Sequence, residues 1–148
     1  MSSHRGRRGR GAPPRRMGVR RERELVREAW SSGLYAVRSP ASGAGTAMPR
    51  PDLIIFGRGG VVDVVQIKTT RRRRVRYTPE DWRDELEVAD RLRRLGFKVR
   101  VLLDFTLILG GGLQSIHKRF VVDGHENCAL NISYNGKRKE ITHYWVEK

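Results

Sequence analysis

Cysteine, acidic residues and long apolar runs are all scarce in this sequence. Its one cysteine, Cys128, cannot form an internal disulfide, which is typical of proteins in a reducing compartment. No apolar run approaches the roughly 20 residues that a membrane-spanning helix needs, and no signal-peptide core, lipidation motif or basic amphipathic helix is evident. The four histidines and the cysteine lack the paired spacing of a zinc site. We therefore expect a cytoplasmic protein with no membrane association and no structural zinc.

The shortage of acidic residues indicates the class of partner. The 148 residues contain 16 Asp and Glu against 31 Lys and Arg, so the formal net charge is +15. Such an excess repels itself unless it meets a polyanion, and nucleic acid is the first candidate. Six of the 31 basic residues are lysine, and the other 25 are arginines, which suit forked contacts with phosphate oxygens. No small-molecule cofactor is indicated.

The N-terminal segment differs in composition from the rest of the chain. Its first 21 residues contain eight arginines and no acid, together with glycines and the pair Pro13 and Pro14, so this segment cannot fold alone. We expect residues 1–17 to form a disordered basic tail, which could also bind phosphates without sequence specificity. The hydrophobic content of 38% suffices for one core. Residues 18–122 should form a single domain, with 123–148 as a C-terminal β-hairpin extension of it.

Hydrophobic periodicity predicts a mixture of helices and strands. The predicted helices cover residues 19–32 and 79–95, and the predicted strands cover 34–38, 52–56, 61–68, 97–103 and 113–122. The run 61–68 is almost continuously β-branched, which is typical of a central strand covered on both faces. Thr78, Pro79 and Asp81 form a capping-box-like start to the second helix. An Asn-Gly pair at 135–136 indicates a hairpin, so the C-terminal stretch should be β-structure.

Glu22 lies on the apolar stripe of the first predicted helix. Leu25, Val26 and Ala29 follow it at i+3, i+4 and i+7, so its carboxylate shares their side of the helix. Two interpretations stay open. In the first, which the helix pattern alone favours, the acid lies at a frayed helix start, is stabilised by the helix dipole and points to water; in the second it points inward and needs a partner.

A second set of polar residues flanks two predicted strands. Asp52 precedes the first strand and Gln66, Ile67 and Lys68 end the second, so a hairpin would bring these ends together. Side chains alternate along a strand, which places Gln66 and Lys68 on one face and Asp63 and Ile67 on the other. Asp63 should therefore face solvent or an arginine rather than the same site.

These residues can supply the ligands of a hard divalent cation. The carboxylate of Asp52, the amide oxygen of Gln66, the carbonyl of Ile67 and the carboxylate of Glu22 are all oxygen donors. Lys68 would lie beside the bound water, where it could position or deprotonate that water and offset charge on a pentavalent phosphate. Such a site predicts phosphodiester hydrolysis.

Five short motifs occur in order between about residue 18 and residue 122. They are 21–26 (RERELV), 35–39 (YAVRS), 42–43 (SG), 50–54 (RPDLI) and 67–69 (IKT). In this order they resemble the archaeal Holliday junction resolvases, which are nucleases of the PD-(D/E)xK type. The resemblance implies an α/β, restriction-endonuclease-like fold with a mixed central β-sheet flanked by helices. It also implies a homodimer, dependence on Mg²⁺ for which Mn²⁺ can substitute, and paired cuts in four-way (Holliday) junction DNA.

The resemblance also assigns roles by position. Glu22 would be the helix-borne acid of the metal site, Asp52 the central metal ligand and Lys68 the catalytic lysine. Arg38 would hold a phosphate near the site, and Ser42 would touch the junction backbone.

Further DNA contacts are expected from Arg23 and from the run Arg71, Arg72, Arg73 and Arg74. This run follows Lys68 closely enough to contact a junction arm, although such runs are usually solvated surface. Trp82 and Trp30 are expected in the core or in a dimer face rather than stacked on bases.

Gln66 departs from the family pattern, in which a glutamate occupies this position. A neutral amide binds a cation less strongly than a carboxylate does. The site could tolerate glutamine, Glu22 could compensate, or the chain could be a lapsed paralogue that binds branched or duplex DNA without cutting it. Retention of Asp52 and Lys68 favours activity. A restriction-type nuclease that acts on linear DNA is a further alternative.

Overall fold

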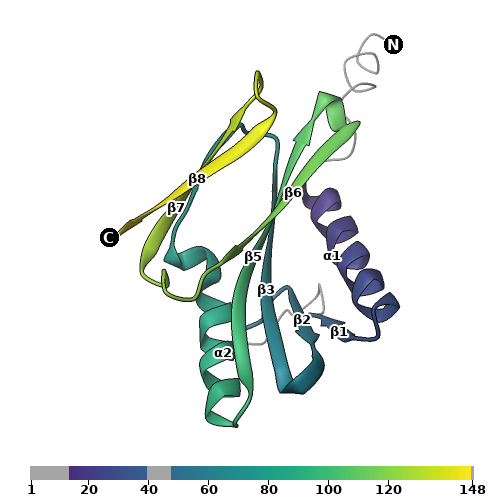
Figure 1. The fold of residues 1–148 in the computed structure, drawn as a ribbon, viewed down its shortest axis with the longest axis vertical. Coiled ribbons are helices and arrows are strands. Elements are labelled where there is room, and N and C mark those ends of the chain that lie inside the picture. Colours follow the sequence, from purple (N-terminus) through teal and green to yellow (C-terminus); the bar gives the residue numbers. More distant parts are fainter. Residues whose placement is uncertain (1–13, 40–47, 148) are drawn as a thin grey trace.

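The computed structural model describes residues 14–39 and 48–147, and within these residues the strands form two β-sheets (Figure 1). Residues 1–13 of the predicted tail, and Ser42 with its loop, lie outside the described residues. No helix in the described part of the chain is long and apolar enough to cross a membrane.

The first sheet is mixed, as expected for the predicted fold class. Its strands lie in the order β1 (Tyr35–Arg38), β2 (Leu53–Phe56), β3 (Val61–Thr70), β5 (Lys98–Leu109) and β6 (Gln114–Val121). β3 and β5 are parallel, and the other neighbours are antiparallel. A parallel pair needs a crossover connection, which here contains α2 (Arg83–Arg94) after a 3-10 turn at Pro79–Trp82. The fold-class prediction is confirmed.

β3 is covered on both faces. Val64 is fully buried and belongs to the core cluster that includes Ala89 of α2, whereas its equally buried neighbour Val65 packs with Leu25 of α1 (Pro14–Ser31). Each such side chain contributes about 1.5–3 kcal/mol through burial. The two helices therefore lie on opposite faces, and the prediction of a central strand is confirmed.

The helix starts differ from the prediction in two places. α1 begins at Pro14, five residues before the predicted start and inside the segment assigned to the tail, because proline suits the first turn of a helix. The capping box of Thr78 and Asp81 is present, but it opens the 3-10 turn, and α2 itself begins at Arg83.

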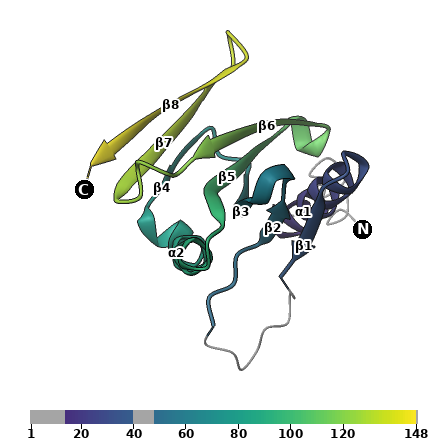
Figure 2. The same ribbon diagram turned by 60° about the horizontal axis from the view of Figure 1, so that its bottom comes forward.

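The second sheet contains a strand that the sequence analysis did not predict. It consists of β4 (Arg74–Tyr77), β7 (Cys128–Asn135) and β8 (Glu140–Glu147), all antiparallel. β4 is the strand that was not predicted, whereas β7 and β8 confirm the predicted C-terminal β-structure. Its inner residues, such as Leu130 and Ile132, pack on the same core cluster as β5 and α2. Figure 2 shows this sheet on the side of β5 and β6 away from α1.

The two tryptophans of the helical regions have different environments. Trp82 is fully buried and its indole nitrogen donates to the carbonyl oxygen of Glu126 at 3.1 Å, so its place in the core is confirmed. Trp30 is 56% exposed and meets Tyr35 edge to face, so a core position for Trp30 is wrong. It lies in the last turn of α1, beside the edge strand β1.

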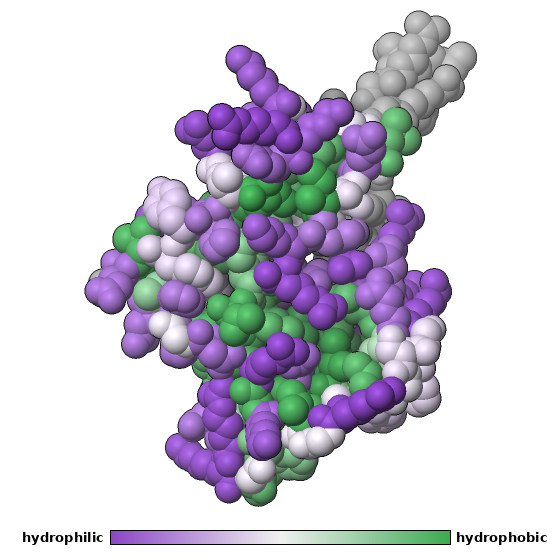
Figure 3. All heavy atoms as spheres, in the orientation of Figure 1, coloured by the Kyte–Doolittle hydropathy of each residue, from purple (hydrophilic) through white to green (hydrophobic). Residues whose placement is uncertain are grey.

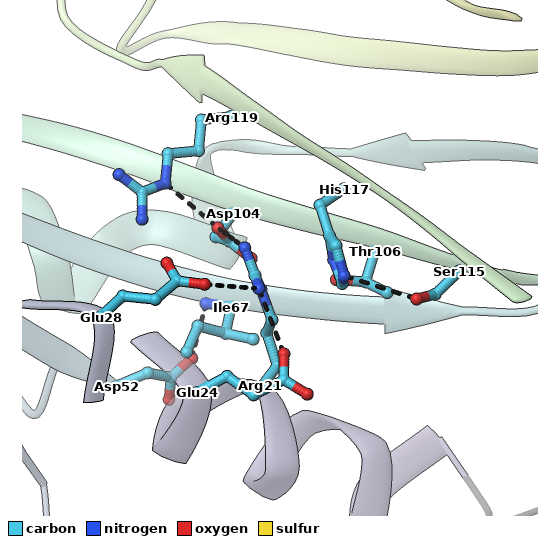
Figure 4. Close-up of polar contacts among 10 residues, drawn as sticks. All are labelled: Arg21, Glu24, Glu28, Asp52, Ile67, Asp104, Thr106, Ser115, His117 and Arg119. Carbon is cyan, nitrogen blue, oxygen red and sulfur yellow. Dashed lines mark hydrogen bonds and ion pairs between the residues drawn. The ribbon is translucent and has the colours of Figure 1, made fainter. Parts of the chain in front are cut away.

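Asp104 and Glu85 are acids buried in the core. Asp104, on β5, accepts hydrogen bonds from Arg21 of α1 at 2.9 and 3.2 Å and from Arg119 of β6 at 3.2 Å (Figure 4). Glu85 of α2 has no such cation among the described residues, and its Oε2 atom is buried there without a hydrogen-bond partner. Burial, with Asp52 and Asp84 nearby, raises the pKa of Glu85 to about 8. The first acid is neutralised by ion pairs and the second by its own proton.

Asp104→Asn should lower the free energy of unfolding by about 3–5 kcal/mol, because Arg21 would lose its fully buried anion and keep only the more exposed Glu24 and Glu28 as partners. Chemical denaturation followed by tryptophan fluorescence measures the change. Asp63→Asn is the matched control, since the partner of Asp63, Arg100, has a 55% exposed side chain and such pairs contribute about 1 kcal/mol or less. Equal losses in the two variants would contradict a structural role for the buried pair.

Glu85→Gln should remove a pH dependence of stability. Between its ordinary pKa of 4.5 and the raised value of about 8, the folded chain keeps a proton that the unfolded chain releases. The free energy of unfolding of the wild type should therefore fall as the pH rises through this window, by several kcal/mol at most. Thermal unfolding is measured in EDTA at both ends of the window. The stability of the variant relative to the wild type should increase as the pH rises. A constant difference would mean that Glu85 ionises normally.

Candidate active site

The candidate site lies where β2 ends beside β3. The last pair of the β2–β3 ladder joins Leu53 to Val65, so the following residues of β3 have no β2 partner on this edge. Asp52, directly before β2, occupies the position instead: the backbone amide of Ile67 donates to its Oδ2 atom at 2.8 Å. The acid is thereby held against the open edge of the central strand.

A cavity of about 380 Å³ opens at this edge. It is lined by Gly18, Val19 and Glu22 of α1, by Asp52, and by Gln66, Ile67, Lys68 and Thr69 of β3. All five residues that the sequence analysis assigned to metal binding or catalysis therefore meet in one place. They come from three segments, namely a helix, the residue before an antiparallel strand and the end of the central strand.

Glu22 points into this cavity. Its side chain is 18% exposed and accepts a hydrogen bond from Nε of Arg38 at 3.1 Å. Of the two interpretations left open by the helix pattern, the inward one is correct. Burial, followed by the nearby Asp52 carboxylate, raises the pKa of Glu22 in spite of Arg38.

The pKa of Asp52 is raised as well, and Asp52 is more deeply buried than Glu22. Burial raises the pKa of its carboxyl, although the hydrogen bond from Ile67 and the charge of Lys68 act in the opposite direction. Two neighbouring acids with raised pKa values form a site that a cation would stabilise.

Lys68 has a partner that the sequence analysis did not identify. Its ammonium group lies 2.8 Å from Oδ1 of Asp81 and 5.6 Å from the ring centre of Tyr77. The other oxygen of Asp81 accepts a hydrogen bond from the backbone amide of Thr78 at 2.8 Å. Sequence spacing identified Asp81 as a helix cap, and the same carboxylate also fixes the lysine. Nothing in the sequence pattern indicates this second contact.

Gln66 lies beside the other donors. Its amide nitrogen is 3.4 Å from the carbonyl oxygen of Ile67, so the side chain must turn before both oxygens can face one cation. Asp63, on the opposite face, pairs with Arg100 at 2.8 and 2.9 Å, as expected.

The donor set fits a hard divalent cation. Two carboxylates, one amide oxygen and one backbone carbonyl are the ligand types that Mg²⁺ and Mn²⁺ accept. Within the described residues no group of three or more His, Cys, Asp and Glu side chains is placed to hold a metal ion. At this cavity the lining side chains include two acids, Glu22 and Asp52, and the amide of Gln66.

The residues that are expected to contact DNA have different environments. Arg38 is engaged with Glu22, and Arg23 is exposed on α1. Arg72 and Arg73 are exposed between β3 and β4, with Arg73 over the ring of Tyr134 at 5.4 Å; Arg74 is exposed at the start of β4, and Arg71 is partly buried. Ser42 lies outside the described residues.

Comparisons with known proteins identify the family and the fold. Residues 14–120 match the family model described as "Archaeal holliday junction resolvase (hjc)". The fold matches a solved structure of Hjc, a Holliday junction resolvase from Archaeoglobus fulgidus, with a TM-score of 0.51 and 23% identity over 74% of this chain and 80% of that one. A search of curated proteins found no match. Because the family model covers most of the chain, this protein belongs to the archaeal Holliday junction resolvase family of nucleases.

Proposed function

We propose that this protein is a Mg²⁺-dependent, structure-selective endonuclease that resolves four-way DNA junctions by paired phosphodiester hydrolysis. The observation that carries the proposal is the convergence of Glu22, Asp52, Gln66 and Lys68 on one cavity at the open edge of β3. Family membership supports the substrate class. The net charge of +15 supports a polyanionic partner.

The residues of the site divide the chemistry between them. A bound Mg²⁺ ion would polarise the scissile phosphate and lower the pKa of a bound water. Asp52 and Glu22, with the oxygens of Gln66 and Ile67, would hold that ion. Lys68, kept in place by Asp81, would hydrogen-bond the attacking water and offset the negative charge that develops on the phosphate.

Arg38 has two possible partners in this mechanism. Without DNA it is paired with Glu22 at 3.1 Å. A phosphate near the site would compete for its guanidinium group, and a cation would take over the charge of Glu22. Binding of substrate and metal would then favour each other. A cation bound to Glu22 would release Arg38 for the phosphate, and a phosphate bound to Arg38 would release Glu22 for the cation.

Paired cutting requires two such sites in one complex. We infer a homodimer, in which two copies of the cavity address two strands of the junction. Selection of a four-way junction would then rest on the spacing of two basic surfaces rather than on contacts with bases.

A binding-only paralogue is the second candidate, because one specific observation favours it. Gln66 takes the place of a third acid and its nitrogen faces the Ile67 carbonyl, so metal affinity should be lower than with glutamate. A restriction-type nuclease for linear DNA is a third candidate, since this fold also serves such enzymes.

Cleavage of a labelled four-way junction separates these candidates. With Mg²⁺ the wild type should nick the junction symmetrically and leave a linear duplex of the same sequence intact. Asp52→Asn should lose nearly all cleavage, by a factor on the order of a hundred or more, because the central ligand loses its charge.

The other outcomes identify the other candidates. Tight junction binding without nicks in Mg²⁺ or Mn²⁺ would establish the binding-only paralogue. Equal cutting of the linear duplex would establish the restriction-type enzyme.

Gln66→Glu should raise the affinity for Mg²⁺ on the order of tenfold, because a charged oxygen replaces a neutral one in the ligand set. Calorimetric titration of the DNA-free protein measures this directly. Gln114→Glu is the matched control, since it adds the same charge at an exposed position of β6 outside the cavity. Equal affinities for all three proteins would place Gln66 outside the ligand set.

A further inference from the structure

The second sheet has an inner and an outer face, and the strand register defines them. Val75 and Tyr77 of β4 pair with Ile132 and Leu130 of β7, and these side chains join the core. The alternate residues therefore point away from the core. Arg76, Asn131 and Tyr144 form one row across the three strands, and Arg74, Ser133 and Thr142 form the next.

These six residues share one chemical property. Arginine, asparagine, serine, threonine and tyrosine are the side chains that hydrogen-bond the phosphates and sugars of DNA. Arg74, Arg76 and Thr142 are exposed, and Tyr144 is 61% exposed. No acid lies in either row. Along the described β8, Glu140 stands at the hairpin end of this face, 3.8 Å from Arg138.

The face is hollowed rather than flat. All of the six residues except Thr142 line a cavity of about 410 Å³, together with backbone neighbours. A second cavity of about 650 Å³ continues it through Arg74 and Ser133 to Arg73, Lys137 and Thr142. Figure 3 shows hydrophilic side chains gathered over the β7–β8 hairpin. The result is a continuous basic groove that runs along the sheet to the hairpin.

This groove lies only partly within features already assigned. Arg73 and Arg74 belong to the arginine run that is expected to contact DNA, and β4 lies within the family match, whereas β7 and β8 lie beyond its end at residue 120. None of the six residues lines the cavity that contains Asp52 and Lys68. The face that β4 forms with β7 and β8 is therefore not accounted for by the family match or by the proposed chemistry.

We propose that the outer face of the β4-β7-β8 sheet binds the sugar-phosphate backbone of duplex DNA. The inference rests on the proposed function in one respect, namely that the duplex would be an arm of the same branched substrate. Arg74 and Arg76 are two residues apart on one strand, about 7 Å, and lie on the same face of the sheet. Their long side chains can therefore reach two separate phosphates of one backbone.

A duplex fits this face better than an unpaired strand. Proteins that bind single strands stack successive bases on several aromatic side chains. In the two described rows Tyr144 is the one aromatic residue, and its hydroxyl can serve a phosphate as Ser133 and Thr142 can.

The test measures binding of a short DNA duplex in EDTA over a series of salt concentrations. The double variant Arg74→Ala/Arg76→Ala should reduce the slope of log affinity against log salt by about 2 units, and reduce affinity on the order of tenfold or more at low salt. The matched control is Arg83→Ala/Arg94→Ala, which removes two exposed arginines of α2. The control should leave the slope close to that of the wild type.

Three results would overturn the inference. Equal effects of the two double variants would mean that the overall charge, and not this face, binds DNA. An unchanged slope in Arg74→Ala/Arg76→Ala, with normal thermal unfolding, would exclude both arginines from the interface. Tighter binding of single-stranded DNA, lost in Tyr144→Ala but kept in Tyr144→Phe, would replace the duplex with an unpaired strand.

The binding assay and the cleavage assay test the groove and the proposed function independently. Because binding is measured without metal, a wild type that binds duplex through this face but does not cut junctions contradicts the proposed function alone. A wild type that cuts junctions, with no effect of the groove variants on binding, overturns the groove alone.

Discussion

β3 is paired with β2 only as far as Val65, and the arrangement of the site depends on where that pairing ends. Val64 and Val65 are buried on opposite faces and hold α2 and α1 to the sheet. β2 ends opposite Val65, so the amide of Ile67 needs another acceptor, because an unpaired buried amide costs about 1–3 kcal/mol. Asp52 accepts that hydrogen bond. One bond therefore completes the edge of the sheet and places the central acid of the candidate site.

The distribution of charge follows from the small number of acids. Several of them are buried or half-buried and are balanced locally: Asp104 by arginines, Glu22 by Arg38, and Glu85 by a proton. Much of the large arginine excess is left for the surface. The molecule thus combines a locally acidic cavity, suited to a cation, with basic surfaces suited to DNA phosphates.

Local geometry made part of this structure predictable. The β-branched run identified β3, and a simple hairpin brought Asp52 to Gln66 and Lys68, because strand alternation and strand pairing act over short distances. The spacing of apolar residues placed Trp82 in the core. β4 was missed because it has four residues, begins within the arginine run and pairs only with the distant β7, although its alternation of charged and apolar side chains fits a half-buried strand. The exposure of Trp30 excludes the core, and a dimer face stays the prediction for it; helical spacing alone does not show where the sheet ends.

The sequence by itself determined the mixed fold, the basic character, the family motifs and the hairpin that brings Asp52 to Gln66 and Lys68. Each of these depends on composition or on spacing along a short part of the chain, whereas the inward position of Glu22 was decided by the packing of α1. The tertiary structure alone decided which titratable side chains meet across elements: Arg21 with Asp104, 83 positions away, Asp81 with Lys68, and Glu85 with Asp52 nearby. It also aligned Arg76 with Tyr144 on one face. Such contacts depend on how helices and sheets pack, and packing follows from the burial of the whole apolar surface rather than from local spacing.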